Sequence, residues 1–216
     1  MGLAAALLGG PECDAVLARI ASLPPQSAGD RAFLRHGWCC DLALRLRALP
    51  PLRDVLPPDA AAVQCTYFEK SRTRNWLVAW HQDRSIAVAR RLDHPLLKGW
   101  SRKDGAWHVQ PPAPVLEGML AVRLHLDACS IGDGALRVVP GSHRHGHLGE
   151  AQAAALRAER GEHACVLPRG GALLMRPLAL HASSRSCGAG RRRVLHFVFA
   201  PARLPLGLEW ADGLRP

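Results

Sequence analysis

A series of short strand-like segments, separated by Gly and Pro turns, restricts the fold more than any other feature of the sequence. The last segment, residues 192–199, places Val194, His196 and Val198 on one face and Arg193, Leu195, Phe197 and Phe199 on the other. Both faces are largely apolar, which is typical of a strand buried between two layers. The other predicted strands cover residues 63–68, 76–83 with a continuation to 88, 119–126, 135–139, 164–167 and 172–175. This pattern predicts a mainly β fold of the jelly-roll type.

Helical patterns precede and interrupt these strands. Residues 12–23 carry apolar side chains at helical spacing, and residues 31–49 place Leu34, Trp38, Leu42 and Leu46 on one stripe, with Gly37 weakening the middle. Residues 150–160 form an Ala-rich amphipathic helix between strands. The 216 residues lie within the normal size of one domain. We expect a single domain, 1–216, in which a helical part, 1–60, packs on a β core, 61–200.

The net charge of +10 raises the question of nucleic-acid binding. Of the 28 basic residues 25 are Arg, and they are scattered from Arg19 to Arg215 with one run of three at 191–193. Aromatic residues make up 5% of the chain and do not alternate with the basic ones, so no stacking platform is visible. A nucleic-acid partner is therefore disfavoured, and non-specific binding of polyanions remains open.

Cysteine usage and hydropathy predict the cellular location. The seven cysteines are odd in number and show no zinc-like or disulfide-framework spacing, which favours a reducing compartment. The apolar start of the chain lacks a basic n-region, and no segment approaches the roughly 18 apolar residues of a membrane span. We expect a cytoplasmic protein without a membrane partner. The sequence does not specify an oligomeric state.

A metal site is indicated by Trp80-His81-Gln82-Asp83. On an extended segment His81 and Asp83 point to the same side, whereas Gln82 points away from it. A second His from far along the chain, for which we choose His181, would complete a 2-His-1-carboxylate triad that leaves three positions of an octahedral Fe(II) open. A surface His beside a carboxylate is the competing interpretation of this pair, because an H-x-D pattern alone is weak.

Two further segments carry chemistry-bearing residues without a clear pattern. Residues 94–114 contain two Trp and several Gly and Pro but no sustained period, so we predict either a partly packed lid over the site or plain scaffolding. His143, His145 and His147 stand at i, i+2 and i+4 in a Gly-flanked loop. No strand pattern surrounds them, which favours an exposed polar loop over a metal site.

Four segments then occur in a fixed order: W-H-Q-D at 80–83, G-A-L-R-V-V-P-G-S-H at 134–143, H-A-S at 181–183, and Arg192. Together they resemble the phytanoyl-CoA dioxygenase family of Fe(II)/2-oxoglutarate-dependent oxygenases. The resemblance covers roughly residues 63 to 200. It implies a double-stranded β-helix, the jelly-roll, cupin-like core of that family, in agreement with the strand pattern.

The resemblance also implies roles for individual residues. It makes His81, Asp83 and His181 the iron ligands, and it places the Arg that binds the cosubstrate at Arg192, eleven positions after the distal His. Strand alternation alone leaves Arg191, Arg192 and Arg193 open. Ser183 matches a family position whose hydroxyl helps to hold the far carboxylate of the cosubstrate.

The chemistry of the residue types agrees with these roles. A guanidinium binds a carboxylate through two parallel hydrogen bonds, which suits the C5 carboxylate of 2-oxoglutarate. The α-keto acid end would chelate the iron and leave one position for O2, so that a C–H bond is hydroxylated while succinate and CO2 are released. Related halogenases replace the carboxylate ligand by a small residue, and Asp83 therefore predicts hydroxylation. The alternative is a non-catalytic jelly-roll protein that binds a small ligand.

The substrate is not specified by the family resemblance, since fold similarity does not transfer substrate. We expect a small molecule, and candidate contacts are Arg123, His125, Trp107, His108 and Gln110. Arg123 and His125 share one face of the strand 119–126, and Arg123 would favour an anionic substrate. An Arg at this position could equally pair with a structural acid.

Overall fold

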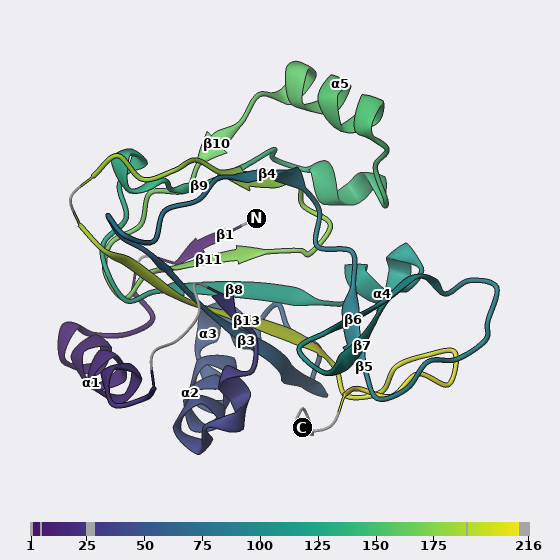
Figure 1. Cartoon of the computed structure of the whole chain (residues 1–216), viewed down its shortest axis with the longest axis horizontal. Helices are drawn as coiled ribbons and strands as arrows, with labels where there is room; N and C mark the ends of the chain where they lie inside the picture. Colours follow the sequence, from purple (N-terminus) through teal and green to yellow (C-terminus); the bar gives the residue numbers. More distant parts are fainter. Residues whose placement is uncertain (1, 5, 25–28, 189, 212–216) are drawn as a thin grey trace.

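The core is a sandwich of two antiparallel sheets (Figure 1), and the computed structural model describes residues 2–4, 6–24, 29–188 and 190–211. The larger sheet has the order β1-β11-β8-β13-β3-β2, and its strands are β1 Gly2–Ala4, β2 Gly29–Asp30, β3 Ala60–Lys70, β8 Leu120–His125, β11 Ala172–Met175 and β13 Arg192–Pro201. The smaller sheet has the order β10-β9-β12-β4, with β4 Val78–His81, β9 Leu136–Val138, β10 His163–Ala164 and β12 His181–Ser183. The predicted jelly-roll type of fold is confirmed.

Strand β13 is the centre of the larger sheet, because it pairs with β3 on one side and with β8 on the other. Its two faces separate as the alternation predicts. Leu195, Phe197 and Phe199 join the hydrophobic cluster that also contains helix residues, whereas His196 and Val198 line the space between the sheets. Full burial of each Leu or Phe stabilises the fold by about 1.5–3 kcal/mol, so this strand anchors both layers.

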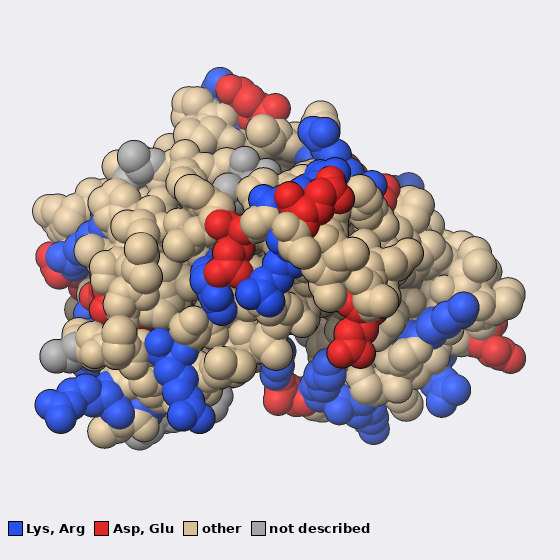
Figure 2. All heavy atoms as spheres, turned by 90° about the horizontal axis from the view of Figure 1, so that it is seen from above, with Lys and Arg blue, Asp and Glu red and all other residues tan. Residues whose placement is uncertain are grey.

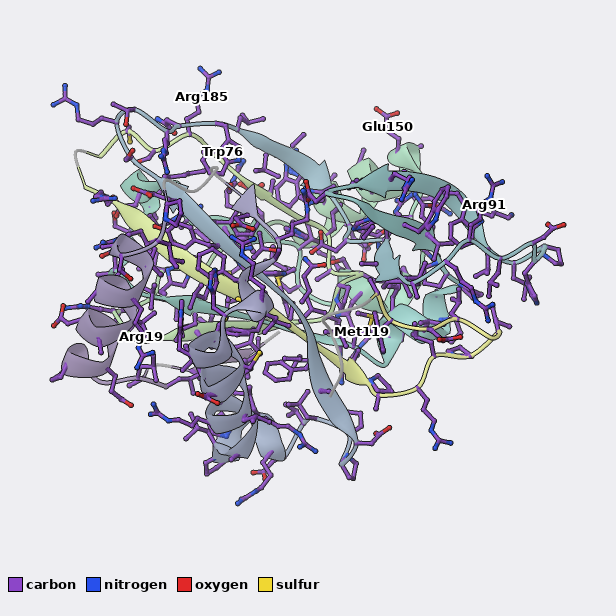
Figure 3. The ribbon with its side chains drawn as sticks, turned by 60° about the horizontal axis from the view of Figure 1, so that its bottom comes forward. Arg19, Trp76, Arg91, Met119, Glu150 and Arg185 are labelled. Carbon is purple, nitrogen blue, oxygen red and sulfur yellow. The ribbon has the colours of Figure 1, made fainter. Side chains whose placement is uncertain are left out.

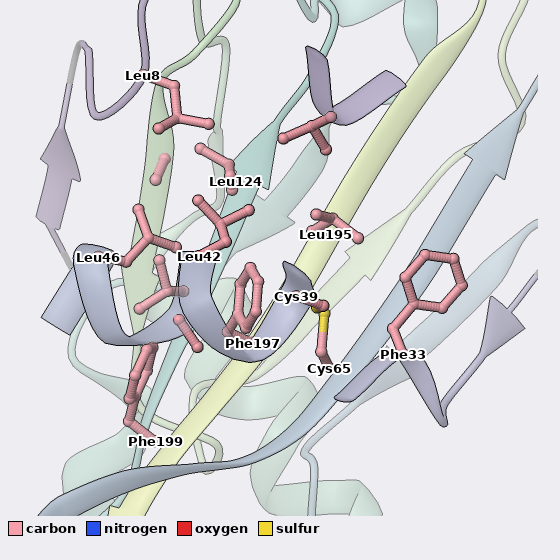
Figure 4. Close-up of a cluster of buried hydrophobic side chains, with 14 of the residues drawn as sticks. Leu8, Phe33, Cys39, Leu42, Leu46, Cys65, Leu124, Leu195, Phe197 and Phe199 are labelled. Atoms are coloured by element: carbon pink, nitrogen blue, oxygen red, sulfur yellow. The ribbon is translucent and has the colours of Figure 1, made fainter. Parts of the chain in front are cut away.

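Helices cover the outer face of the larger sheet (Figure 1). They are α1 Gly10–Ala21, the 3-10 helix η1 Phe33–Arg35, α2 Gly37–Ala48 and α3 Pro50–Arg53. Leu42 and Leu46 of α2 pack against Leu195, Phe197 and Phe199 of β13 (Figure 4). The sequence predicted Gly37 in the middle of one helix over residues 31–49, and this is wrong. Gly37 begins α2, because a separate turn of 3-10 helix precedes it.

Residues 94–114 show no sustained period in the sequence, yet they contain regular structure. They contain β6 Lys98–Lys103 and β7 Ala106–Gln110, which pair with β5 Ile86–Val88 in a third, three-stranded sheet. Asp104 and Gly105 make the turn with φ of 50° and 82°, the left-handed pair that a two-residue hairpin requires. The Asp-Gly pair was the available signal, but strands of five or six residues with Trp, Gly and charged side chains showed no clear alternation.

Two other predicted strand boundaries also need correction. The segment 76–88 is not one strand, because β4 ends at His81 and the chain then crosses to β5 in the third sheet. Of the predicted strand 164–167 only Ala164 lies in a strand, the two-residue β10. His181 follows the strand 172–175 along the chain and begins a strand of its own in the opposite sheet. The predicted residues 150–160 form α5 Glu150–Arg160, outside the smaller sheet (Figure 1).

The remaining elements are short: the helix α4 Ala113–Glu117 and the 3-10 helices η2 Ile131–Asp133 and η3 Ser142–His145. Helix η3 contains two of the three spaced histidines. Among the described residues, the histidines of 143–147 do not form a cluster with the spacing of metal ligands. No helix in the described parts of the chain is both long and apolar enough to cross a membrane.

Candidate metal and cosubstrate site

Three predicted metal ligands meet between the two sheets. His81 ends β4 and His181 begins β12, and the two residues are direct partners in the antiparallel pairing of these strands. Asp83 lies just beyond β4, where its backbone N–H donates to the carbonyl of Pro177. One Asp83 carboxylate oxygen is 3.6 Å from Nε2 of His81, and the other is 3.8 Å from Nε2 of His181. The potential ligand atoms all lie within 4.8 Å of one another, and among the described residues they are the only such group of three.

Backbone carbonyl groups orient both histidine rings. Nδ1 of His81 is 2.8 Å from the carbonyl oxygen of Ala79, and Nδ1 of His181 is 2.8 Å from that of Ala179. A carbonyl can only accept, so each Nδ1 must carry the proton and each Nε2 presents a lone pair toward Asp83. In metal-binding histidines, a hydrogen bond from the ring nitrogen that does not bind the metal usually fixes the orientation of the ring. Two imidazole nitrogens and a carboxylate suit Fe(II), so the residues fit the predicted metal.

The ionisation of the three candidate ligands also favours metal binding. Burial opposes ionisation of Asp83, but the neighbouring His181 and the hydrogen bond with His81 lower the pKa of this carboxyl well below its usual range. Burial lowers the pKa of His181, which keeps it neutral, whereas the hydrogen bond to Asp83 raises the pKa of His81. A divalent cation would bind on the Nε2 side of both histidines, since ligands must be deprotonated to bind.

Gln82, between the two ligands, is buried and faces away from them. Its Nε2 donates to the carbonyls of Gly146 and Leu178, at 2.8 and 2.7 Å, and its Oε1 accepts from the N–H of Leu148 at 2.9 Å. The side chain thus links the end of β4 to two other loops. These bonds position the segment from which His81 and Asp83 project.

The triad faces a cavity of about 1030 Å³, which runs between the sheets and extends out to α5. In Figure 3, Trp76 and Arg185 lie toward one end of the sandwich, Arg91 lies toward the other, and Met119 lies inside among the strands. Met119 and Trp76 both line the cavity. With a volume of about 1030 Å³, the cavity is large enough for a cosubstrate together with a second small molecule.

Arg192 lies at the Trp76 end of this cavity. It is 3% exposed, and it is the direct pairing partner of Lys70 on β3. One terminal nitrogen of its guanidinium donates to the carbonyl of Gly134, while its Nε has no hydrogen-bond partner. Arg191 and Arg193 instead point away from the cavity and form ion pairs with Glu69 and Asp127. The tertiary structure thus distinguishes among three adjacent arginines that alternation alone left open.

Lys70 is a residue of the cavity that the sequence analysis missed. Its Nζ donates to Oγ of Ser183 at 2.9 Å and to the carbonyl of Ser184 at 2.6 Å, and it lies 5.4 Å from the centre of the Trp76 ring. Burial, together with the charges of Arg192 and Arg123, lowers the pKa of Lys70 to about 7. Nothing in the sequence marked it, because the predicted strand ended at residue 68. In the structure β3 continues through Lys70.

Of the five predicted substrate contacts, Arg123, His108 and Gln110 line the cavity. His125 is buried but is not part of its wall. Trp107 packs edge-to-face on Trp100, with the guanidinium of Arg102 above its ring. The structure therefore brings three of the five together with the triad.

His196 is a second cavity residue that the sequence analysis did not assign to the site. Its Nδ1 accepts a hydrogen bond of 3.1 Å from the Arg123 guanidinium, and the two residues are opposite each other on β13 and β8. Burial and the charge of Arg123 lower the pKa of His196 to about 3, so it is neutral. Within the described parts of the chain, the side-chain hydrogen-bond partner of Arg123 is therefore this histidine and not a structural acid.

Figure 2 shows how charged side chains are distributed over one face of the molecule. On the face in Figure 2, basic side chains form small groups, and acidic side chains stand beside several of them. A continuous basic stripe of the kind that follows a phosphate backbone is not visible on this face.

Comparison with known proteins places this geometry in a family. The model of the family described as "Phytanoyl-CoA dioxygenase (PhyH)" matches residues 26–194, well over half of the chain. No curated protein sequence matches the chain.

Solved structures of similar fold cover nearly the whole chain. HygX from Streptomyces hygroscopicus with nickel and 2-oxoglutarate bound is 17% identical, covers 99% of this chain and 89% of its own, and has a TM-score of 0.65. EctD from S. alaskensis with 2-oxoglutarate and 5-hydroxyectoine is 18% identical, covers 93% and 72%, and has a TM-score of 0.66. At these identities the structures establish a shared fold, and the family model supplies the assignment. The chain belongs to the phytanoyl-CoA dioxygenase family and is an Fe(II)- and 2-oxoglutarate-dependent oxygenase.

Proposed function

We propose that this oxygenase hydroxylates a C–H bond of a small molecule, with His81, Asp83 and His181 as the iron ligands. The observation that carries the proposal is the convergence of these three side chains, with both Nε2 atoms free, on the cavity that contains Arg192. When bound, iron and 2-oxoglutarate supply the activation of O2. The residues of the chain hold, orient and enclose the reactants.

The cosubstrate would lie between the triad and Arg192. Arg192 has unused donors and is almost fully buried, so a carboxylate would gain a strong, charge-assisted hydrogen bond there. Ser183 and Lys70 stand next to this position, where Nζ of Lys70 can donate a further hydrogen bond to the C5 carboxylate. Lys70 thus joins Arg192 and Ser183 as a proposed cosubstrate residue.

Asp83 supports hydroxylation rather than halogenation. A halide would need the ligand position that the Asp83 carboxylate takes, and this carboxylate lies close to both histidines. A small-molecule substrate is consistent with the solved structures of similar fold, in which HygX holds hygromycin B and EctD holds 5-hydroxyectoine.

The three adjacent arginines allow a matched test of the cosubstrate site. Fe(II)-dependent succinate formation from 2-oxoglutarate is measured for the Arg192→Gln variant, with Arg191→Gln as control. We expect the KM for 2-oxoglutarate to rise by about 100-fold or more in Arg192→Gln, since a buried charge-assisted pair is lost, and to stay unchanged in Arg191→Gln. Equal KM values in the two variants would remove Arg192 from the cosubstrate site. Absence of iron-dependent succinate formation in the wild type would refute the hydroxylase.

A further inference from the structure

The inner face of the larger sheet carries three buried cations. Lys70, Arg192 and Arg123 are 1%, 3% and 7% exposed, and all three line the cavity. Within the described chain their hydrogen-bond partners are neutral: Ser183 and a carbonyl for Lys70, a carbonyl for Arg192, and His196 for Arg123. A buried charge without a counter-charge is costly, so such a cluster is expected where anions bind.

The cations lie at two positions along β13, which we call the Arg192 level and the Arg123 level. Arg192 of β13 pairs directly with Lys70 of β3, whereas Arg123 of β8 pairs with His196, four residues further along β13. Four residues of a strand span about 13 Å, which is longer than the five-carbon chain of 2-oxoglutarate. A cosubstrate whose C5 carboxylate lies at Arg192 therefore leaves the Arg123 level for another anion, or for its own metal-chelating end.

Charge balance favours another anion. At the metal, two positive charges would be offset by Asp83 and by the C1 carboxylate of the cosubstrate, and the C5 carboxylate would offset Arg192. Lys70 lies beside that carboxylate and can lose its proton, but an Arg remains protonated. Arg123 is thus the permanent buried cation that iron and 2-oxoglutarate leave without a counter-charge.

The position of Arg123 is suited to binding a substrate. Its guanidinium lies over the Phe68 ring, 5.3 Å from the ring centre, and its Nε is buried without a hydrogen-bond partner. The stacking and the bond to His196 hold the group rigid, while free donors remain. His196 also interacts electrostatically with Asp83 and His181, which places this level next to the triad.

The outer part of the cavity is also basic. Four further cations line it toward the surface, and Glu150 is the one described acid of its wall apart from Asp83, although Arg31 and Arg157 already pair with Asp104 and Glu162 outside the wall. These cations are Arg31, Arg84, Lys103 and Arg157. A basic entrance with low-dielectric walls attracts anions and raises their local concentration.

Resting on the proposed function, we infer that the substrate is a small acid whose anionic group pairs with Arg123, so that the hydroxylated carbon lies close to that group. Arg123 then determines specificity, and neutral or cationic analogues are excluded because they would leave its charge buried and unpaired.

The test measures binding of a small anion to the loaded protein without turnover. The protein is loaded with Zn(II) and N-oxalylglycine, an inert analogue of 2-oxoglutarate, and acetate and acetamide are titrated by calorimetry and ligand-observed NMR. We expect acetate to bind and acetamide not to bind. In Arg123→Gln the affinity for acetate should fall by about tenfold or more, with the affinity for N-oxalylglycine unchanged. Arg123→Lys should keep part of the acetate binding, and Arg191→Gln, an exposed arginine outside the cavity, should keep all of it.

Three outcomes would overturn the inference. Acetate binding that survives in Arg123→Gln would place the anion on the metal, and equal binding of acetamide would remove the charge requirement. A loss of N-oxalylglycine affinity in Arg123→Gln as large as that in Arg192→Gln would assign Arg123 to the cosubstrate. Failure of the wild type to bind N-oxalylglycine in a metal-dependent way would instead refute the proposed function, so the two failures are distinguishable.

Discussion

His81 and His181 are direct partners across two antiparallel strands, and their ring centres are 4.2 Å apart. This pairing presents both Nε2 atoms to Asp83. Because side chains alternate along a strand, a shift of one residue in the pairing of β4 and β12 would turn one histidine to the opposite face. The register of these two strands therefore determines whether a metal site exists.

Removing the carboxylate of the triad should abolish metal binding. Asp83→Ala leaves two imidazoles, and we expect the affinity for Fe(II) to fall by more than the roughly 10–100-fold that is typical of losing an outer-shell partner. Competition with a chromophoric chelator measures the affinity. Asp127→Ala, which removes a carboxylate paired with Arg193 instead, is the control and should bind metal normally. Equal affinities in the two variants would contradict the ligand assignment.

Gln82 should contribute to stability through its three backbone partners. In Gln82→Glu the new carboxylate can still accept from Leu148 and from Nε of Arg84, but it faces the carbonyls of Gly146 and Leu178 without a donor. Leaving these two buried carbonyls against a charged acceptor should lower the free energy of unfolding by about 1–3 kcal/mol, as measured by urea denaturation. If Gln82→Glu had the same denaturation midpoint as the wild type, these hydrogen bonds would not hold the segment in place.

The buried amine of Lys70 should make stability depend on pH. Its pKa of about 7 in the folded protein lies below the value of about 10.4 for an unfolded chain. The unfolded state then binds the proton more tightly, so the folded state is penalised fully below pH 7 and regains stability as the pH rises from 7 toward 10. Lys70→Met, without ligands, should exceed the wild type by about 2 kcal/mol at pH 6, after allowance for lost hydrogen bonds, and this advantage should shrink with rising pH.

Denaturation at pH 6, 7.5 and 9 measures the effect of Lys70→Met. The variant Lys98→Met, at an exposed position of β6, is the control and should follow the wild type across this range. Parallel pH profiles for the wild type and Lys70→Met would mean that the amine is not destabilised by burial.

Two arginines on the larger sheet should respond oppositely to the same substitution. Arg123 has no carboxylate partner, so Arg123→Met should raise the unfolding free energy of the ligand-free protein by about 1–3 kcal/mol. Arg193 makes two hydrogen bonds to Asp127, at 2.8 and 2.6 Å, and Arg193→Met should lower it by about 1–3 kcal/mol. Thermal unfolding of both variants tests whether the two unfolding free energies change in opposite directions. A loss of stability in Arg123→Met would indicate a structural role for Arg123.

Much of the fold follows from local patterns. The alternation along residues 192–199 correctly separated the helix-facing Phe197 from the cavity-facing His196, because this period depends only on neighbouring residues. Helix α5 was predicted with its correct ends, since its Ala-rich sequence favours a helix. The hairpin of β6 and β7 was missed, because its pairing is set by the turn at Asp104 and Gly105 and by contact with β5.

The sequence by itself determined the chemistry of the site: two histidines, a carboxylate and an arginine in the order of a known family. Only the tertiary structure decided which groups share the cavity. Lys70 and Ser183 are 113 residues apart and meet only because β3 and β12 belong to opposite sheets of one sandwich. Likewise the acids that neutralise Arg191 and Arg193, and the neutral partner of Arg123, depend on strand order and register. These are long-range properties, which the period of a single strand does not encode.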